Sequence, residues 1–299
     1  MKFLVIGDYM TDIYTRVCVT RLNPDDPMKP CYKIIGSDVY CQGGAGNVYG
    51  QLVALDSSDV ESCYGYGKIS RTRLLGPDDQ VVMRLDRDSE VQPIDHNKLG
   101  WDVMRRHAFK AIFVSDYGKG SITNELMEKT ILPYRHESPI FINAKKPQDI
   151  AAYFDSRVSF ISMNESEYLR MRAQVPCSLI MTPLVVTNSE SVKLIVGNDR
   201  ITEQPCFTCD PMNATGAGDT FFAVFGATIA ALVPNFGLLD NLAVTNFAMR
   251  LANAFAAAAV EHPLTIAVNV KLAQKFISTD ALLLHKVAEY KVFERITAP

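Results

Sequence analysis

The segment Asn213-Ala-Thr-Gly-Ala-Gly-Asp-Thr220 joins a glycine-rich turn to an acidic residue at the start of an expected helix. The backbone N–H groups of Gly216, Ala217 and Gly218 can point at one anion, and the helix dipole behind such a turn stabilises negative charge. A carboxylate at Asp219 could accept a proton from an attacking hydroxyl. The structural alternative is that the glycines only make a tight turn and that Asp219 caps the helix.

A second glycine-rich stretch, Gly43-Gly44-Ala45-Gly46-Asn47, leads into an expected helix over Val48–Leu55. Glycines at this place let a ligand approach the backbone, and Asn47 offers both a donor and an acceptor to a polyhydroxylated ligand. Such a stretch is by itself more often only a turn. Asp8 and Asp12 follow the first expected strand and could accept hydrogen bonds from the same ligand.

A third candidate group lies in Val114-Ser-Asp-Tyr-Gly-Lys-Gly120. Asp116 ends an expected parallel strand, at the edge where α/β proteins bind ligands, and could accept from a ligand hydroxyl. Lys119 could meet a phosphate as a point charge, and Arg73 and Arg84 are further candidate phosphate contacts. The structural alternatives are a strand-to-helix turn with a solvated lysine, and exposed arginines in cross-strand ion pairs.

Short apolar runs separated by longer helix-compatible stretches organise the chain that must position these residues. The runs are Phe3–Ile6, Ala111–Val114, Ile140–Ile142, Phe160–Ser162 and Leu184–Val186, with helical patterns at Thr123–Tyr134, Asn164–Ala173 and Asp219–Val233. This alternation predicts an α/β fold with a mostly parallel central sheet covered by helices. Alternating patterns and turn residues over 12–41 and 63–94 predict a small antiparallel lid, within a single domain over 1–299.

The overall composition favours an ordinary globular protein. The 299 residues carry a net charge of −3, which argues against a protein that coats nucleic acid, so no nucleic-acid partner is expected. Seven scattered cysteines, with one C-x-x-C at Cys206–Cys209, fit free thiols in a reducing cytoplasm better than a disulfide framework or a zinc site. The apolar stretches Thr220–Val233 and Asn246–Val260 are predicted to be buried helices, so no membrane role is expected.

Taken together, the glycine-rich stretch with Asp8 and Asp12 resembles the sugar-binding half of the ribokinase-like (phosphofructokinase-B type) carbohydrate kinases. The Asn213–Thr220 segment resembles the C-terminal signature of the same family. Three further segments are similar to the branch that phosphorylates a heptose 7-phosphate: Arg21–Pro27, Arg73–Asp86 and Val114–Gly120. The resemblance covers nearly the whole chain and implies a ribokinase-like three-layer fold with a small β-sheet lid.

The resemblance also implies a reaction and its partners. ATP would donate its γ-phosphate to a hydroxyl of a heptose phosphate or related sugar, with Asp219 as the base and the amides of residues 216–218 stabilising the transferred group. Mg²⁺ would lie near Asn164 and Glu167, often through water; these two residues could equally form a helix capping box. Asn164, Thr187, Thr215, Gly216 and Gly218 are the expected nucleotide contacts. We also expect a homodimer formed through the lid.

Four positions depart from the family pattern, and we expect all of them on the nucleotide side: Asn213, Asn143, Asn188 and Pro263. They replace an aspartate before the anion loop, another aspartate beside a lysine, a glycine-containing turn, and a late Gly-Thr. They leave two alternatives open. The chain could be a catalytically weakened sugar- or nucleotide-binding relative, or a kinase for another sugar or a nucleoside.

Overall fold

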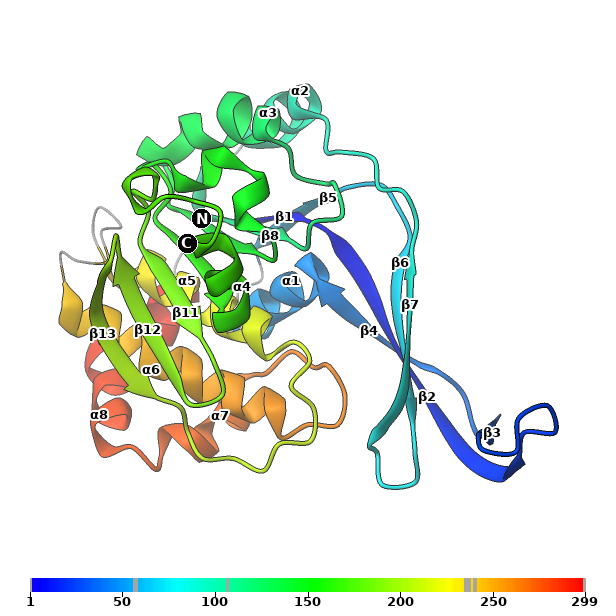
Figure 1. Cartoon of the computed structure of the whole chain (residues 1–299). Coiled ribbons are helices and arrows are strands. Elements are labelled where there is room, and N and C mark those ends of the chain that lie inside the picture. The colour runs from blue at the N-terminus through cyan, green and yellow to red at the C-terminus, as the bar shows by residue number, and fades with distance from the viewer. Residues whose placement is uncertain (1, 56–58, 106–107, 234–237, 239–240, 298–299) are drawn as a thin grey trace.

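Two sheets of different size organise the chain (Figure 1). The computed structural model describes residues 2–55, 59–105, 108–233, 238 and 241–297, so the two ends of the expected 1–299 domain lie outside the described residues. The large sheet has eight strands in the order β13-β12-β11-β10-β9-β8-β1-β5. Their bounds are β1 Lys2–Gly7, β5 Val60–Tyr64, β8 Phe109–Asp116, β9 Ile140–Ala144, β10 Phe160–Asn164, β11 Leu184–Thr187, β12 Ser191–Val196 and β13 Asp199–Pro205.

The six strands from β5 to β11 are all parallel, and β12 runs in the opposite direction, paired antiparallel with β11 on one side and with β13 on the other. All five apolar runs of the sequence lie inside these parallel strands, so the predicted α/β fold with a mostly parallel sheet is confirmed. In β1 the side chains alternate between the two faces: Phe3 and Val5 enter one apolar core, and Leu4 and Ile6 enter the other. Burial on both faces is the reason that the strands are continuous apolar runs.

Helices cover both faces of the large sheet. The core that contains Phe3 and Val5 is closed by α1 Ala45–Ala54, α5 Ala217–Leu232, α6 Leu242–Val260, α7 Val270–Ile277, α8 Ala281–Tyr290 and α9 Val292–Thr297. The other face carries shorter helical segments: α2 His96–Lys98, η1 Leu99–Met104, α3 Asn124–Leu126, η2 Met127–Ile131, η3 Leu132–His136, η4 Pro147–Asp149, η5 Ala151–Phe154, α4 Glu165–Arg172 and η6 Cys177–Leu179.

The predicted helices form, with one difference in detail. The stretch 123–134 is helical but changes from α to π to 3₁₀ geometry along its length, with Pro133 in the 3₁₀ part, where its missing N–H cannot support regular α hydrogen bonding. Asn164 caps α4 in a complete capping box with Glu167. Helix α6 is long and apolar enough to cross a membrane, but 72% of its apolar window is buried inside the protein. It is a core helix, as predicted.

The small sheet projects from the body as the lid (Figure 1). Its strands are β2 Tyr9–Leu22, β3 Pro30–Ile34, β4 Val39–Gly44, β6 Ile69–Leu75 and β7 Val81–Asp88, in the order β3-β2-β6-β7 with β4 also paired to β2. The expectation of a wholly antiparallel lid is wrong at one place, because β2 and β6 are parallel. Strands β2 and β6 continue from β1 and β5, which are parallel neighbours, and so leave the body in the same direction. Cys63 and Tyr64, placed in the lid from sequence, belong to β5.

An aromatic cluster joins α5 to the large sheet. Phe222 is fully buried and meets Phe113 edge-on, with ring centroids 5.5 Å apart, and Phe160 at 6.0 Å. Phe225, one turn later, lies 4.9 Å from Phe160. These contacts fix α5, and therefore its first turn, against the strands of the sheet.

The substitution Phe222→Ala is expected to lower the free energy of unfolding by ~3–5 kcal/mol, because it removes a large buried ring and leaves a cavity. Urea unfolding followed by circular dichroism would measure the loss. The matched control is Leu282→Ala on α8, where the side chain is 67% exposed and little change is expected. Equal losses in the two variants would contradict the role given to this cluster.

Candidate active site

The carboxyl ends of the parallel strands meet the first turn of α5 at one edge of the large sheet. Strand β1 has β5 on one side and β8 on the other, so the chain order reverses beside it. Such a switch point is where open α/β sheets bind ligands. Asp8 directly follows β1, Asp116 ends β8, and Asn143 lies at the end of β9. The structure therefore brings together residues that are more than a hundred positions apart in the sequence.

Asp219 is the centre of this group. Its carboxylate is 3% exposed and accepts hydrogen bonds from three side chains that come from three different elements. The Tyr117 hydroxyl lies 2.8 and 2.9 Å from its two oxygens, Asn143 Nδ2 donates to Oδ1 at 3.1 Å, and Asn47 Nδ2 donates to Oδ2 at 3.3 Å. Gly216, not Asp219, is the N-cap of α5. The capping alternative is therefore wrong, and the carboxylate is directed into the site.

The pKa of Asp219 is raised to about 6, chiefly by burial and in smaller part by the charge of Asp12. The positive charge of Lys145 and the hydrogen bonds from Tyr117 and Asn47 act in the opposite direction. A carboxylate with this pKa is ionised near neutral pH and is still basic enough to take a proton from a hydroxyl. Its electrostatics therefore suit a general base.

The turn before α5 has the geometry expected for an anion site. Gly216 has a φ of +84°, a left-handed conformation that side chains disfavour, and a Cβ there would lie only 2.6 Å from Asn47 Nδ2. No side chain caps the amides at the start of this helix in the described structure. Gly216, Ala217, Gly218 and Asp219 line one end of a cavity of about 630 Å³. Amides that face a cavity at a helix start can bind an anion, and the amide of Ala217 also makes a long hydrogen bond to the carbonyl of Ala214 at 3.4 Å.

The same cavity extends from this turn toward an apolar end. That end is lined by residues of β12, α6 and the loop after β13: Val192, Cys206, Phe207, Cys209, Asn253, Ala257 and Val260. Burial raises the pKa of both Cys206 and Cys209, which keeps these thiols protonated. Asn253 is buried, and its Nδ2 has no hydrogen-bond partner. The lining of the cavity thus includes the turn before α5, several apolar side chains and the buried Asn253.

Asp8 and Asp116, expected to contact a ligand, have their oxygens directed at the protein. Asp8 accepts from the backbone amides of Tyr117 (2.7 Å), Lys119 (3.1 Å) and Ser121 (3.2 Å). Asp116 accepts from the amide of Gly118 at 2.8 Å and from the hydroxyl of Tyr153, also at 2.8 Å. Both residues therefore shape the 117–121 loop, and a direct ligand contact from either stays a prediction.

Asp12 and Arg73 were expected to meet a sugar and its phosphate, but here they bind each other. Arg73 Nη1 lies 2.6 Å from Asp12 Oδ1, and both side chains are buried. Gly43 packs beside this pair, since a Cβ there would lie 2.8 Å from Asp12 Oδ2. Gly44 is the N-cap of α1. The Gly43–Asn47 stretch therefore lies between Asp12 and the base.

Two of the four departures, Asn213 and Pro263, lie outside the lining of this cavity, and their place relative to a nucleotide stays a prediction. Asn213 Nδ2 donates to the hydroxyl of Tyr14 at 3.0 Å and to the carbonyl of Pro263 at 3.1 Å. Thr265 contacts the same Tyr14 hydroxyl at 2.6 Å and Asp12 at 3.3 Å. These segments pack against strand β2 of the lid because Tyr14 is fully buried among them. Of the four departures, Asn143 and Asn188 line the cavity.

The other candidate cations are also paired with acids of the lid. Lys119 Nζ lies 2.5 Å from Asp88, and Arg84 lies 2.7 Å from Asp86. Arg71, which the sequence analysis missed, is buried and lies 2.6 Å from Asp88. The two-residue spacing of Arg71 and Arg73 was the available signal in the sequence, because residues two apart in a strand lie on the same face. In β6 that face is the buried one. A ligand phosphate would have to exchange with these carboxylates.

The Asn164–Glu167 pair is committed to the capping box of α4. Glu167 Oε2 accepts from the amide of Asn164 at 2.8 Å, and its Oε1 lies 3.2 Å from Lys145 Nζ. Among the described residues no group of three or more His, Cys, Asp or Glu side chains could hold a metal ion. Asn164 and Thr187 line the cavity, whereas Thr215 is not among its lining residues. Lys145, also missed from sequence as a site residue, lines the cavity beside Asp219.

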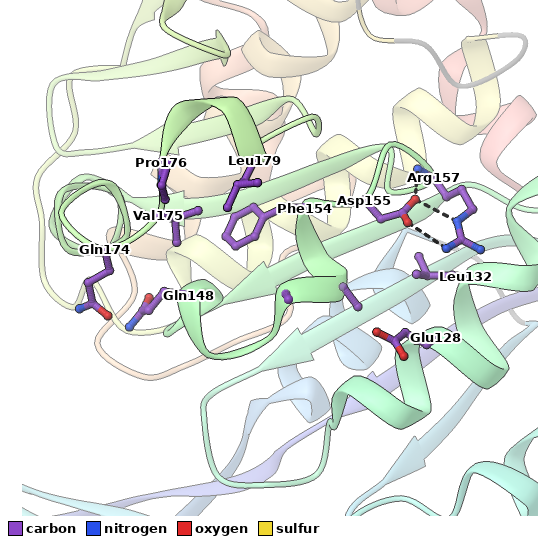
Figure 2. Close-up of a pocket in the computed structure, with 12 residues that line it drawn as sticks. Glu128, Leu132, Gln148, Phe154, Asp155, Arg157, Gln174, Val175, Pro176 and Leu179 are labelled. Atoms are coloured by element: carbon purple, nitrogen blue, oxygen red, sulfur yellow. Dashed lines mark hydrogen bonds and ion pairs between the residues drawn. The ribbon is translucent and has the colours of Figure 1, made fainter.

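A larger hollow of about 710 Å³ lies between η5 and the segment after α4 (Figure 2). Phe154, Val175 and Leu179 form its apolar wall, and two of its charged groups, Asp155 and Arg157, are paired with each other at 2.8 Å. It contains none of the residues that the sequence predicted for a site. The cavity beside Asp219 is therefore the better candidate, although it is smaller.

Comparisons with known proteins show similarity in sequence and in fold. No protein-family model matches the chain. The chain is 30% identical over 295 residues to the bifunctional protein HldE of Geobacter sulfurreducens, covering 83% of this chain and 59% of that protein. It is 24% identical over 298 residues to the HldE protein of Trichlorobacter lovleyi, with 84% and 59% covered. The chain thus spans about three fifths of the length of these curated relatives.

Solved structures share the fold. Phosphofructokinase-2 from Escherichia coli in complex with fructose-6-phosphate superposes with a TM-score of 0.67 at 11% identity, covering 93% of this chain and 98% of that one. Arabidopsis thaliana ribokinase complexed with ribose and ATP gives a TM-score of 0.63 at 15% identity, with 92% and 98% covered. At such identities the likeness concerns the fold.

The pH dependence of stability should reveal the cost of burying Asp116. Burial raises the pKa of Asp116 to about 6, from 3.8. The folded protein therefore binds this proton more tightly than the unfolded chain, and stability falls as pH rises through that window. The isosteric change Asp116→Asn removes the charge and can keep both hydrogen bonds. It is expected to stabilise the protein at pH 7 by on the order of 1–2 kcal/mol, and to lose this advantage near pH 4.

Urea unfolding of wild type and variant at a series of pH values would measure the effect. Asp155→Asn is the control of opposite sign, since the hydrogen bond from Arg157 lowers the pKa of Asp155. That variant should gain no stability at pH 7. A constant difference between Asp116→Asn and wild type from pH 4 to 7 would contradict the charge-burial explanation.

Proposed function

Because the chain belongs to the ribokinase-like family of carbohydrate kinases, and its sequence is similar to those of HldE proteins, we propose that it phosphorylates a sugar hydroxyl with ATP. The observation that carries this proposal is the buried Asp219 at the start of α5, between the cavity and Asn47. A base in this position has an anion-binding turn directly beside it. The acceptor hydroxyl and the phosphate would thus meet at one point.

The chemistry assigned to these residues is proton transfer and charge stabilisation. Asp219 takes the proton of the acceptor hydroxyl while the oxygen of that hydroxyl attacks the γ-phosphorus of ATP, and ADP leaves. The amides of Gly216, Ala217 and Gly218 stabilise the negative charge on the transferred group, with Lys145 as a nearby cation. Positioning and electrostatics contribute most of the catalysis in phosphoryl transfer, so few side chains need to act chemically.

We assign the nucleotide to the 630 Å³ cavity, with its phosphates at the Gly216 turn and its base at the apolar end. Mg²⁺ belongs to this proposal as part of the MgATP substrate. The oxygens of Glu167 are already used by Asn164 and Lys145, which supports a contact to the ion through water. When bound, the ion would neutralise charge on the phosphates.

The proposed acceptor is a heptose 7-phosphate or a related sugar phosphate, bound between the Gly43–Asn47 stretch and the lid. The resemblance of Val114–Gly120 supports it, and so does the position of Lys119 at the junction of body and lid. Asp88, the partner of Lys119, is on the exposed strand β7, so a phosphate can replace Asp88 beside Lys119 at a modest cost in free energy. Free thiols at all seven cysteines support a cytoplasmic location.

A homodimer through the lid is the proposed assembly. Every residue of the edge strand β7 is exposed, including Val81, Met83 and Leu85, and Ile34 on the other edge strand β3 is exposed as well. Edge strands that carry exposed apolar side chains are rarely left bare, and a two-fold dimer is the commonest way to cover them. A second copy of this lid presents the same apolar side chains and is therefore the proposed partner.

The substitution Asp219→Asn is expected to lower kcat by at least ~10²-fold while sugar binding is retained, because only the proton acceptor is lost. In the wild type kcat/KM should rise as pH increases through about 6, where the carboxylate becomes ionised, and then level off. Coupled ADP-release assays with heptose 7-phosphate, fructose phosphates, ribose and adenosine would measure both. A variant that keeps more than about a tenth of wild-type turnover would rule out this base. Sugar binding without any turnover in the wild type would favour the weakened relative.

Neutral replacement of the true phosphate contact should cost ~2–3 kcal/mol in kcat/KM toward the phosphorylated sugar and much less toward its unphosphorylated analogue. Lys119→Gln is expected to show this pattern more strongly than Arg84→Gln. Arg73→Gln leaves the buried Asp12 unpaired and should mainly destabilise the fold, by ~3–5 kcal/mol. Equal losses on both sugars for Lys119 and Arg84 would remove the sugar-phosphate assignment.

The substitution Leu85→Glu on β7 is expected to convert a dimer into a monomer, since it places a charge in the apolar contact. Light scattering over a range of protein concentrations would report the mass. Leu282→Glu, an exposed position on α8, is the control and should leave the dimer intact. A wild-type monomer at every concentration would disprove the assembly.

A further inference from the structure

Three donors already surround the base. A carboxylate oxygen has two in-plane lone-pair sites. Asp219 Oδ1 accepts from Asn143 and Oδ2 accepts from Asn47, and the Tyr117 hydroxyl, which has a single proton, lies within hydrogen-bonding distance of both oxygens. Each oxygen thus has one amide donor of its own and shares the proton of Tyr117, so an acceptor hydroxyl that donates to Asp219 competes with the Tyr117 hydroxyl for its position.

Tyr117 is the donor best able to move. Asn143 lies within β9, and Asn47 lies in α1 and is also 3.3 Å from the carbonyl of Gly216. Tyr117 is in a loop that is only partly buried, next to Gly118 with a φ of +67°. Its backbone amide is held by Asp8, so the ring can turn while the chain stays in place.

The Tyr117 hydroxyl is also chemically the same kind of donor as a sugar hydroxyl. It sits against both oxygens of the base at 2.8 and 2.9 Å, which are normal distances for an O–H donor to a carboxylate. Its ring lies beneath Lys145, with Nζ 5.0 Å from the ring centre. The side chain thus occupies the space between the base and the cation at the cavity wall.

We propose that Tyr117 determines which hydroxyl Asp219 deprotonates. The Tyr117 hydroxyl stays hydrogen-bonded to Asp219 until a sugar hydroxyl displaces it, and until then it keeps water away from the base. The proposal rests on the kinase function proposed above and goes beyond it, since it assigns acceptor selectivity to one side chain. Tyr117 is a positioning residue here, because it touches the base and not the substrate.

The reaction that Tyr117 would suppress is hydrolysis of ATP. If water reached Asp219, its oxygen would bond to the γ-phosphorus, its proton would pass to Asp219, and the bond from the γ-phosphorus to the bridging oxygen would break. The products would be ADP and inorganic phosphate. A hydroxyl that fills the same position on the base prevents this without blocking the cavity where the nucleotide would lie.

The change Tyr117→Phe tests this assignment, because it removes the hydroxyl and keeps the ring beside Lys145. Sugar-free ATP hydrolysis is expected to rise about tenfold, and the acceptor sugar to bind about three- to tenfold more tightly by calorimetry, the scale of one hydrogen bond to a charged group. The acid limb of kcat/KM should move to higher pH, because a hydrogen bond that lowers the pKa of Asp219 is lost, while Lys145, Asn47, Asn143 and Asp12 still surround it.

Tyr153→Phe is the matched control. It removes the same kind of bond, at 2.8 Å, from Asp116 instead of the base, and should leave sugar-free hydrolysis at the wild-type value. Tyr117→Ala should act in the same direction as Tyr117→Phe and guards against an effect of the phenyl ring. Circular dichroism of each variant confirms that it is folded.

The outcomes separate this inference from the proposed function. Unchanged hydrolysis and unchanged sugar affinity in Tyr117→Phe, with an active wild type, would overturn the role of Tyr117 alone. A lower kcat without added hydrolysis would also overturn it, because Tyr117 would then assist the reaction. A wild type that neither binds nor phosphorylates any sugar would overturn the proposed function and this inference together.

Discussion

The arrangement of the site depends on one buried negative charge. Asp219 lies almost out of contact with solvent, where a carboxylate is costly unless donors and a cation compensate it. Asn47 from α1, Asn143 from β9 and Tyr117 from the loop after β8 supply those donors, and Lys145 supplies the charge. Three separate segments must therefore dock correctly on the first turn of α5. The aromatic contacts between α5 and the large sheet hold that turn in place.

Charge compensation also explains why so many predicted ligand contacts bind the protein itself. Asp12 pairs with Arg73 inside the lid base, and Lys119 and Arg71 both meet Asp88 on β7. A buried pair such as Asp12–Arg73 is strongly destabilised when one partner is removed, whereas an exposed pair exchanges easily. The lid thus combines fixed ion pairs near the body with exchangeable ones at its surface. A charged ligand would bind by exchange at the second kind.

The acids of the site reduce stability at neutral pH. Burial raises the pKa of Asp116 and of Asp219 to about 6, so each is harder to ionise in the folded protein than in the unfolded chain. For Asp219 this same shift provides a base of suitable strength. In the case of Asp116, the buried carboxylate that has the raised pKa also accepts a hydrogen bond from the 117–121 loop, and this loop places Tyr117 beside the base. Reduced stability at a site is common where its groups are arranged for chemistry.

The sequence by itself determined the α/β fold, the parallel strands, the capping box at Asn164 and the glycine turn before Asp219, because periodicity, glycine placement and helix-start chemistry are local properties. It also brought Asn47 and Asp116 into the candidate site through motif spacing. It could not show that Arg73 binds Asp12, that Pro263–Thr265 packs on Tyr14, or that Asn143 and Tyr117 bond the base. The parallel pairing of β2 with β6 could not be predicted from the sequence either. Each of these depends on which distant segments meet in space, and only the tertiary structure decides that.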